Sequence, residues 1–133
     1  MGKLTCQDLM VGDWFKSVDY NSPFRITAIY DDVVQTQADY QSEIDGNWYS
    51  EVEIKDLVPI PITEDILVKN GFDKDERSKY FHVYTLNIKG SYDFDICWSS
   101  VNGFNYEGDF MLTYVHQLQH LLRLCGVEKE LTI

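Results

Sequence analysis

Residues 57–72 read LVPIPITEDILVKNGF, and this stretch decides how the chain is organised. Pro59 and Pro61 keep the residue between them extended and prevent a helix from starting earlier. Thr63 is a good N-cap, the two acids after it suit the positive end of a helix dipole, and Gly71 ends the helix. The stretch therefore predicts a joint followed by a helix over residues 63–70, and it divides the chain into residues 1–62 and 63–133.

The first part of the chain has the composition of a small β-structure. Strand-forming residues, β-branched and aromatic, are concentrated in five short segments: residues 14–18, 24–30, 33–36, 47–52 and 54–58. Turn-forming residues such as those at 19–23 and 45–46 separate them. So many short strands in so few residues indicate an antiparallel, strongly bent sheet or partial barrel of the SH3-like kind.

The second part predicts strands and one long helix. Three strands are expected at residues 80–88, 92–101 and 104–106, whereas residues 73–79 are charged and read as an exposed connection. Apolar residues recur at helical spacing from about residue 112 to residue 125, ahead of Gly126. We therefore expect an α+β protein in which a three-stranded antiparallel meander packs against a C-terminal helix. Residues 127–133 would follow as an extended tail, and the two parts would form one compact unit.

The chain is strongly acidic. It has 11 Lys and Arg residues against 22 Asp and Glu residues, a formal net charge of -11. This charge repels a phosphate backbone, so direct binding to nucleic acid is not expected. Residues 31–65 hold ten of the acids and a single basic residue, Lys55. Such a segment is either an ordinary solvated surface or a docking face for a basic protein.

Location is indicated by what the sequence lacks. No stretch is as long and apolar as a membrane helix, and the N-terminus has no apolar segment typical of a secretion signal. Cys6, Cys97 and Cys125 are odd in number and far apart, which argues against a disulfide framework or a structural zinc site. We expect a cytoplasmic protein with reduced thiols, no cofactor and no membrane association.

Three segments resemble a known group of proteins. They are the PIPIT segment with the NGF that follows it, residues 8–14 (DLMVGDW) and residues 114–119 (YVHQLQ). Together they are similar to a family of small uncharacterised proteins from anaerobic gut bacteria of the Bacteroidetes type. The resemblance implies that the proline-rich joint and both helices belong to one recurring architecture, and hence a complete protein. It implies no activity.

The histidines of the terminal helix raise the possibility of an enzyme. His116 and His120 are four residues apart, the spacing that two zinc ligands need on a helix. A zinc protease has a Glu after the first His as general base, but here Gln117 stands there and cannot accept a proton at neutral pH. A metal-dependent or hydrolytic enzyme that uses both histidines is therefore an alternative, and ordinary helix-surface histidines are the simpler interpretation.

The hypothesis that the sequence favours is a non-enzymatic interaction or regulatory protein. Trp48 and Tyr49 follow a tight turn and lie beside Glu51 and Glu53, so these four residues are the predicted partner-binding site. A basic protein is the expected partner. Mimicry of nucleic acid, with the acids standing for phosphates on one face, is a further alternative. The sequence indicates no oligomeric state.

Overall fold

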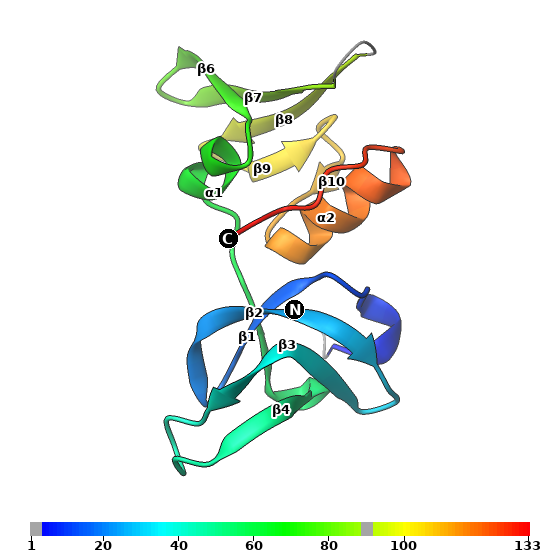
Figure 1. Ribbon diagram of the computed structural model, residues 1–133. Coiled ribbons are helices and arrows are strands. Elements are labelled where there is room, and N and C mark those ends of the chain that lie inside the picture. The colour runs from blue at the N-terminus through cyan, green and yellow to red at the C-terminus, as the bar shows by residue number, and fades with distance from the viewer. Residues whose placement is uncertain (1–3, 89–91) are drawn as a thin grey trace. The chain divides into compact units, whose positions relative to one another are not determined.

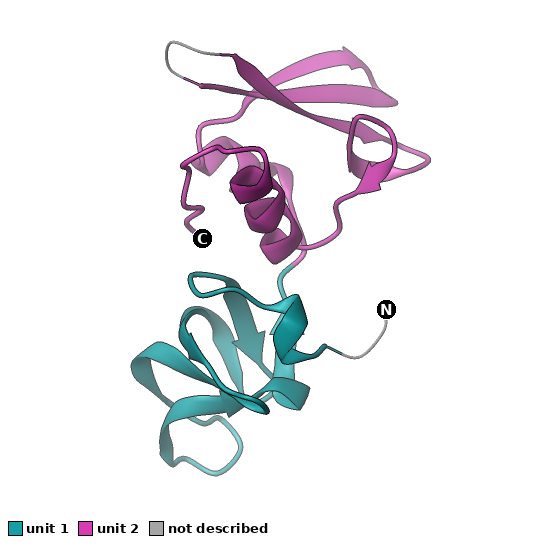
Figure 2. Cartoon of the chain, turned by 90° about the vertical axis from the view of Figure 1, so that its right-hand side faces the viewer, with its two compact units in different colours: residues 1–60 teal, residues 61–133 magenta. Residues whose placement is uncertain are grey.

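The computed structural model describes residues 4–88 and 92–133, so the predicted turn at residues 89–91 lies outside the described residues. It is an α+β fold, mostly strand, and it divides into two compact units, residues 1–60 and 61–133 (Figure 2). The sequence-based boundary, after residue 62, differs from this one by two residues. That the units form one compact body stays a prediction.

Unit 1 is a five-stranded antiparallel sheet that curls into a half-barrel. Its strands are β1 (Trp14–Ser17), β2 (Tyr20–Ile29), β3 (Val33–Gln41), β4 (Trp48–Glu53) and β5 (Leu57–Pro59). They are ordered β4-β3-β2-β1-β5 (Figure 1). A single 3₁₀ turn, η2 (Ile54–Asp56), joins β4 to β5, and another, η1 (Cys6–Asp8), precedes β1. The bent sheet expected from the sequence is confirmed.

The curl of unit 1 follows from irregular strand pairing around one core. The register shifts between Phe15 and Ser17, between Ile26 and Ala28, and between Gln35 and Tyr40. Shifts of this kind bend a strand and increase its twist. The concave side holds a core of nine buried side chains: Leu9, Phe15, Phe24, Ile26, Val34, Tyr40, Val52, Ile54 and Leu57.

Unit 2 is a second antiparallel sheet with two helices, which Figures 1 and 2 place on the same side of it. Its elements are α1 (Glu64–Lys69), β6 (Asp73–Ser78), β7 (Phe81–Asn87), β8 (Asp93–Ser99), β9 (Gly103–Tyr106), β10 (Phe110–Met111) and α2 (Val115–Leu124). The strands follow the chain in space, in the order β10-β9-β8-β7-β6. The predicted meander is therefore present, but it has five strands and not three.

The additional strand β6 corrects the expectation that residues 73–79 are only a connection. Every residue of β6 is exposed, so the alternation of buried and exposed side chains that identifies a strand is missing from its sequence. Pairing with β7 holds it extended, from Asp73 opposite Thr85 to Ser78 opposite Phe81. Its charges suit a sheet edge, because they discourage another chain from pairing there.

Both helices begin and end for local reasons. In α1 the Thr63 side chain accepts a hydrogen bond from the Ile66 amide at 3.3 Å, and Gly71 has a φ of +92°, so the predicted helix is confirmed. Helix α2 begins at Val115, three residues later than expected. Gln117 explains the start, because its side-chain oxygen accepts hydrogen bonds from the amides of Thr113 and Tyr114.

The last seven residues form no regular element, and two buried amides hold them in place. Asn70 exchanges hydrogen bonds with the backbone of Thr132, at 2.8 Å in each direction. Gln119 does the same across residues 129–131, donating to the Lys129 carbonyl and accepting from the Leu131 amide. Buried amides of this kind are stable only because the tail satisfies them.

A buried tyrosine gives unit 2 a testable pH dependence. The Tyr84 hydroxyl is buried and donates to Glu64, whose Oε1 also pairs with the Lys74 ammonium at 2.6 Å. Burial first, and the hydrogen bond to Glu64 second, raise the pKa of Tyr84 to about 12. The folded state therefore disfavours the tyrosinate. The contribution of Tyr84 to the free energy of unfolding is complete below the ordinary pKa of tyrosine and is lost as the pH rises through about 12.

We expect the free energy of unfolding to fall more steeply in wild type than in Tyr84→Phe above pH ~10. Denaturant unfolding of both proteins at pH ~9 and ~11.5 measures the difference, and an ultraviolet titration reports the pKa itself. Equal falls in the two proteins would contradict the assignment.

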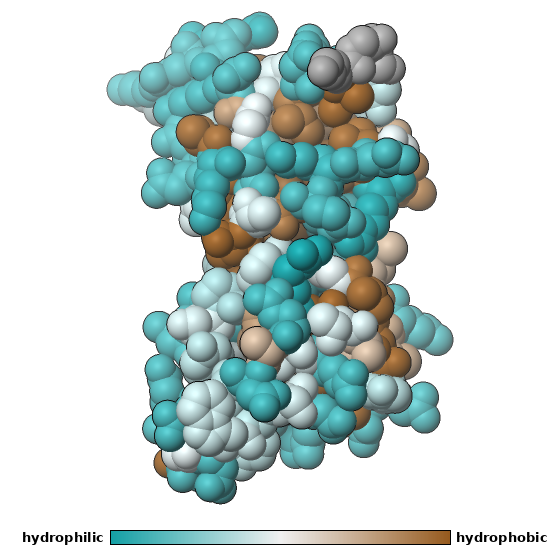
Figure 3. Space-filling view, viewed as in Figure 1, coloured by the Kyte–Doolittle hydropathy of each residue, from teal (hydrophilic) through white to brown (hydrophobic). Residues whose placement is uncertain are grey.

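Hydrophilic residues cover much of the face visible in Figure 3. The most exposed large apolar side chains, Val101, Leu124 and Ile44, are far apart in the sequence. Within residues 4–88 and 92–133, no helix combines the length and the apolar character needed to cross a membrane.

Candidate functional site

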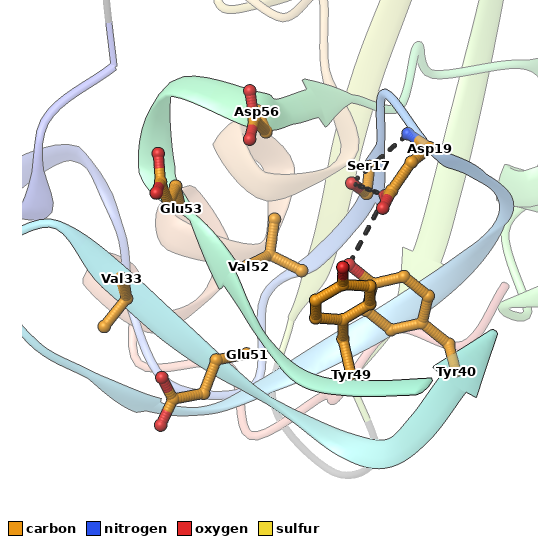
Figure 4. Close-up of a pocket in the computed structure, with 9 residues that line it drawn as sticks. All are labelled: Ser17, Asp19, Val33, Tyr40, Tyr49, Glu51, Val52, Glu53 and Asp56. Atoms are coloured by element: carbon orange, nitrogen blue, oxygen red, sulfur yellow. Dashed lines mark hydrogen bonds between the residues drawn. The ribbon is translucent and has the colours of Figure 1, made fainter. Parts of the chain in front are cut away.

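A pocket of about 350 Å³ opens on unit 1 (Figure 4). Ligand pockets are usually about 300–1,000 Å³, so this one suits a small molecule or a single side chain. Its walls are Ser17, Asp19, Val33, Tyr40, Tyr49, Glu51, Val52, Glu53 and Asp56. In Figure 4 Val52 lies in the middle, with Glu53 and Asp56 to one side and the two tyrosines to the other.

Irregular strand pairing brings the two tyrosines together. Val34 of β3 lies opposite Val52 of β4, and an unbroken register would put Tyr40 opposite Gly46. The shift between Gln35 and Tyr40 instead puts Tyr40 opposite Tyr49, with ring centroids 6.0 Å apart. The bulge that bends the sheet therefore also builds one wall of the pocket.

Asp19 is a carboxylate held in a defined position. It follows β1, and its Oδ1 accepts hydrogen bonds from the Ser17 hydroxyl at 2.5 Å and from the Tyr40 hydroxyl at 3.3 Å. Ser17 and Tyr40 are both buried, so these donors are themselves fixed by packing. Oδ2 accepts no hydrogen bond from the residues that the structure describes, which leaves it available to a ligand.

Both tyrosines are kept in the neutral form. Burial is the main cause that raises the pKa of Tyr40, and the nearby Asp19 charge contributes. The Tyr49 hydroxyl donates to Asp45 at 2.5 Å, which raises the pKa of Tyr49 and lowers that of Asp45. The rings therefore present neutral aromatic surfaces, and half-buried Tyr20 extends them, with its centroid 4.9 Å from that of Tyr40.

The charge of the pocket is entirely negative. Four of the nine residues that line it are acidic, and none is Lys or Arg. The acids are Asp19, Glu51, Glu53 and Asp56. Within the described residues, no group of three or more His, Cys, Asp or Glu side chains is arranged to hold a metal ion. The acids surround the opening and do not converge on one point, a geometry that suits an organic cation with several donors.

The predicted partner-binding residues separate in the structure. Tyr49, Glu51 and Glu53 line the pocket, whereas Trp48 is 67% exposed and is not one of its walls. The sequence reasoning did not select Ser17, Asp19, Tyr40 or Asp56. Their signal was weak, since they occupy different strands and turns, and only the strand pairing brings them together.

The histidines of α2 belong to no metal-binding cluster within the part of the chain that the structure describes. His116 is buried, and its ring centroid is 5.7 Å from that of His120, with the rings nearly perpendicular. The Tyr114 ring stacks on that of His116, with the ring centroids 5.9 Å apart. Because no cluster of three ligating residues occurs in the described part of the chain, the structure does not supply the third ligand that zinc needs.

Comparisons with known proteins add no family or function. No protein-family model matches the chain, and no curated protein or solved structure matches it at a significant level.

Proposed function

We propose that unit 1 is a docking module that binds a cationic side chain of a basic protein partner in the pocket around Asp19. The observation that carries the proposal is the set of four acids that line the pocket together with the apolar side chains of Val33 and Val52, while no lining residue is Lys or Arg. A concave site lined by one sign of charge concentrates the field and attracts the opposite charge. The fixed Asp19 carboxylate supplies a specific hydrogen-bond acceptor.

The tyrosines favour arginine as the bound side chain. Their centroids are 6.0 Å apart, too close for a cation between them, because contact needs about 3.5–4.0 Å on each side. The cation must therefore lie on the open side of Tyr49, which is 36% exposed. A planar guanidinium can stack on that ring while its N–H groups reach the carboxylates, whereas an ammonium offers no flat surface.

The architecture of unit 1 supports a binding role. We infer an SH3-like barrel from the strand order β4-β3-β2-β1-β5 and from the 3₁₀ turn between β4 and β5. A cytoplasmic location and membership of the gut-bacterial family remain part of this proposal, and the free state of all three cysteines is consistent with the first. Nucleic-acid mimicry is less favoured. It needs acidic side chains spread over one face of the protein, whereas here four of them surround a pocket.

The direct test titrates ¹⁵N-labelled protein with N-acetyl-arginine amide and follows the amide resonances. We expect the shifts to cluster at residues 17–19, 40 and 49–56, and to weaken with salt. Asp19→Asn should reduce the affinity roughly tenfold or more, because a hydrogen bond to a charged group contributes about 1.5–3 kcal/mol. Asp39→Asn removes the same charge from an exposed position outside the pocket and should have little effect.

Two outcomes would overturn the proposal. One is binding of N-acetyl-glutamine amide as strong as that of the arginine compound, because the neutral analogue has no charge for the acids to recognise. The other is an equal loss of affinity in Asp19→Asn and Asp39→Asn, because only long-range charge would then be involved. N-acetyl-lysine amide tests the preference for a planar cation and should bind more weakly than the arginine compound.

A further inference from the structure

A second pocket lies next to the first on unit 1. It has a volume of about 340 Å³, and its walls are Leu4, Thr5, Cys6, Asp31, Asp32, Glu53, Ile54 and Lys55. Glu53 also lines the pocket around Asp19, so this one side chain borders both. The two openings are therefore neighbours on the same unit, separated by a shared carboxylate.

The Glu53 carboxylate that borders both pockets is already paired with a cation of the same chain, Lys55. The Lys55 ammonium is 3.1 Å from Glu53 Oε2, and the side chains are 65% and 53% exposed. This contact is the largest cause of the raised pKa of Lys55. Surface ion pairs are generally weak, so an incoming cation could replace Lys55 at little cost.

The walls of the second pocket suit the stem and the head of a long basic side chain. Leu4 and the buried Ile54 provide apolar surface on which methylene groups can pack. Asp31 and Asp32 are exposed and offer carboxylates for the charged end. Together the two pockets are lined by six acidic residues and a single basic residue, Lys55.

We propose that one extended basic segment of the partner fills both pockets, and that Lys55 is a placeholder that this segment displaces. One cationic side chain enters the pocket around Asp19, and a second enters beside Asp31 and Asp32 while its positive charge replaces Lys55 on Glu53. The inference rests on the proposed function, because it takes the first pocket as a cation site. It adds that the ligand is a chain with two basic residues and not a single residue.

The test compares peptides with one and two charges: Ac-Arg-NH₂, and Ac-Arg-(Gly)n-Arg-NH₂ with n from about one to three, since an extended residue spans about 3.3 Å. We expect one spacing to bind at least about tenfold more tightly than the single arginine, because the second contact is intramolecular once the first has formed. Calorimetry or amide-shift titration measures both affinities under the same salt conditions.

Two variants address the second pocket. Asp31→Asn with Asp32→Asn should remove most of the gain from the second arginine and leave the affinity for Ac-Arg-NH₂ within about twofold. Asp39→Asn with Asp73→Asn is the matched control, because it removes equal charge from exposed residues that line neither pocket. All four residues are exposed, and the amide spectrum shows directly whether each variant is folded.

Lys55→Gln gives a result in the opposite direction. Removal of the placeholder should tighten binding of the two-arginine peptide several-fold, and Glu53→Gln in the same chain should abolish that gain. A change in total charge alone would act from any exposed lysine, and Lys69→Gln, an exposed lysine of α1, controls for it.

The inference is overturned if no spacing binds more tightly than Ac-Arg-NH₂, or if the Asp31 and Asp32 variant behaves like its control. It is also overturned if Lys55→Gln and Lys69→Gln have the same effect. In each of these cases Asp19→Asn can still weaken binding of Ac-Arg-NH₂, so the proposed function would stand. Failure of Asp19→Asn itself would reject the proposed function and the inference together.

Discussion

Phe15→Ala is expected to lower the free energy of unfolding of unit 1 by about 3–5 kcal/mol. Phe15 is fully buried in the middle of the core, and its strand β1 is paired on both sides, with Phe24 and Pro59 opposite it. The ring therefore contacts a core that cannot collapse easily into the space it leaves. Small domains are stable by only about 5–15 kcal/mol, so this loss is a large fraction of the total stability of the unit.

The substitution should also abolish binding at the pocket, because Ser17 and Asp19 follow Phe15 on the same strand and its turn. Denaturant unfolding measures the stability, and titration with N-acetyl-arginine amide measures the binding. Ile44→Ala is the control, since its side chain is 75% exposed and should change stability by less than about 0.5 kcal/mol. A loss under about 1 kcal/mol in Phe15→Ala would contradict the core assignment.

Phe94→Ala should cost a similar amount in unit 2, again about 3–5 kcal/mol. Phe94 is 2% exposed and stacks on Tyr106 at 5.0 Å, while its other neighbour, Phe72, meets it edge-on at 6.5 Å. Aromatic pairs add about 0.5–1.5 kcal/mol beyond the area they bury, so two such pairs are lost together. Phe72 follows α1, which means that Phe94 links the sheet to the end of that helix.

Trp98 lies four residues beyond Phe94 on β8 and can report on the unfolding of this sheet. Its fluorescence, measured against denaturant, follows unit 2 best in a protein whose Trp14 and Trp48 are replaced by Phe. Val101→Ala, at a side chain that is 88% exposed, is the matched control. A Phe94→Ala protein with an unchanged midpoint would show that this cluster is not the centre of the core.

Local elements with strong end signals were predictable from the sequence. Thr63 and Gly71 mark α1 because a cap and a left-handed residue act within one turn of the helix. The alternation of Phe94 and Ile96 with Asp93 and Asp95 marks the buried side of β8 in the same local way. Both signals depend on neighbours in the sequence and need no knowledge of the tertiary structure.

Elements whose residues show no alternation of buried and exposed side chains were not predicted correctly from the sequence. Strand β6 has only exposed residues, and pairing with β7 alone makes it a strand. Residues 54–58 were predicted as one extended piece, whereas Ile54–Asp56 form a 3₁₀ turn before β5. The buried Ile54 side chain is part of the core, and such packing overrides a weak local preference.

For the candidate site, the sequence by itself determined its charge and part of its β4 wall, because acids and aromatics cluster in residues 45–56. The tertiary structure decided that Asp19 and Tyr40 join them and that Trp48 does not. The physical reason is the shifted pairing of β3 with β4, which depends on how the whole sheet bends around its core. Composition can therefore indicate what a surface attracts, but strand register decides where the pocket forms.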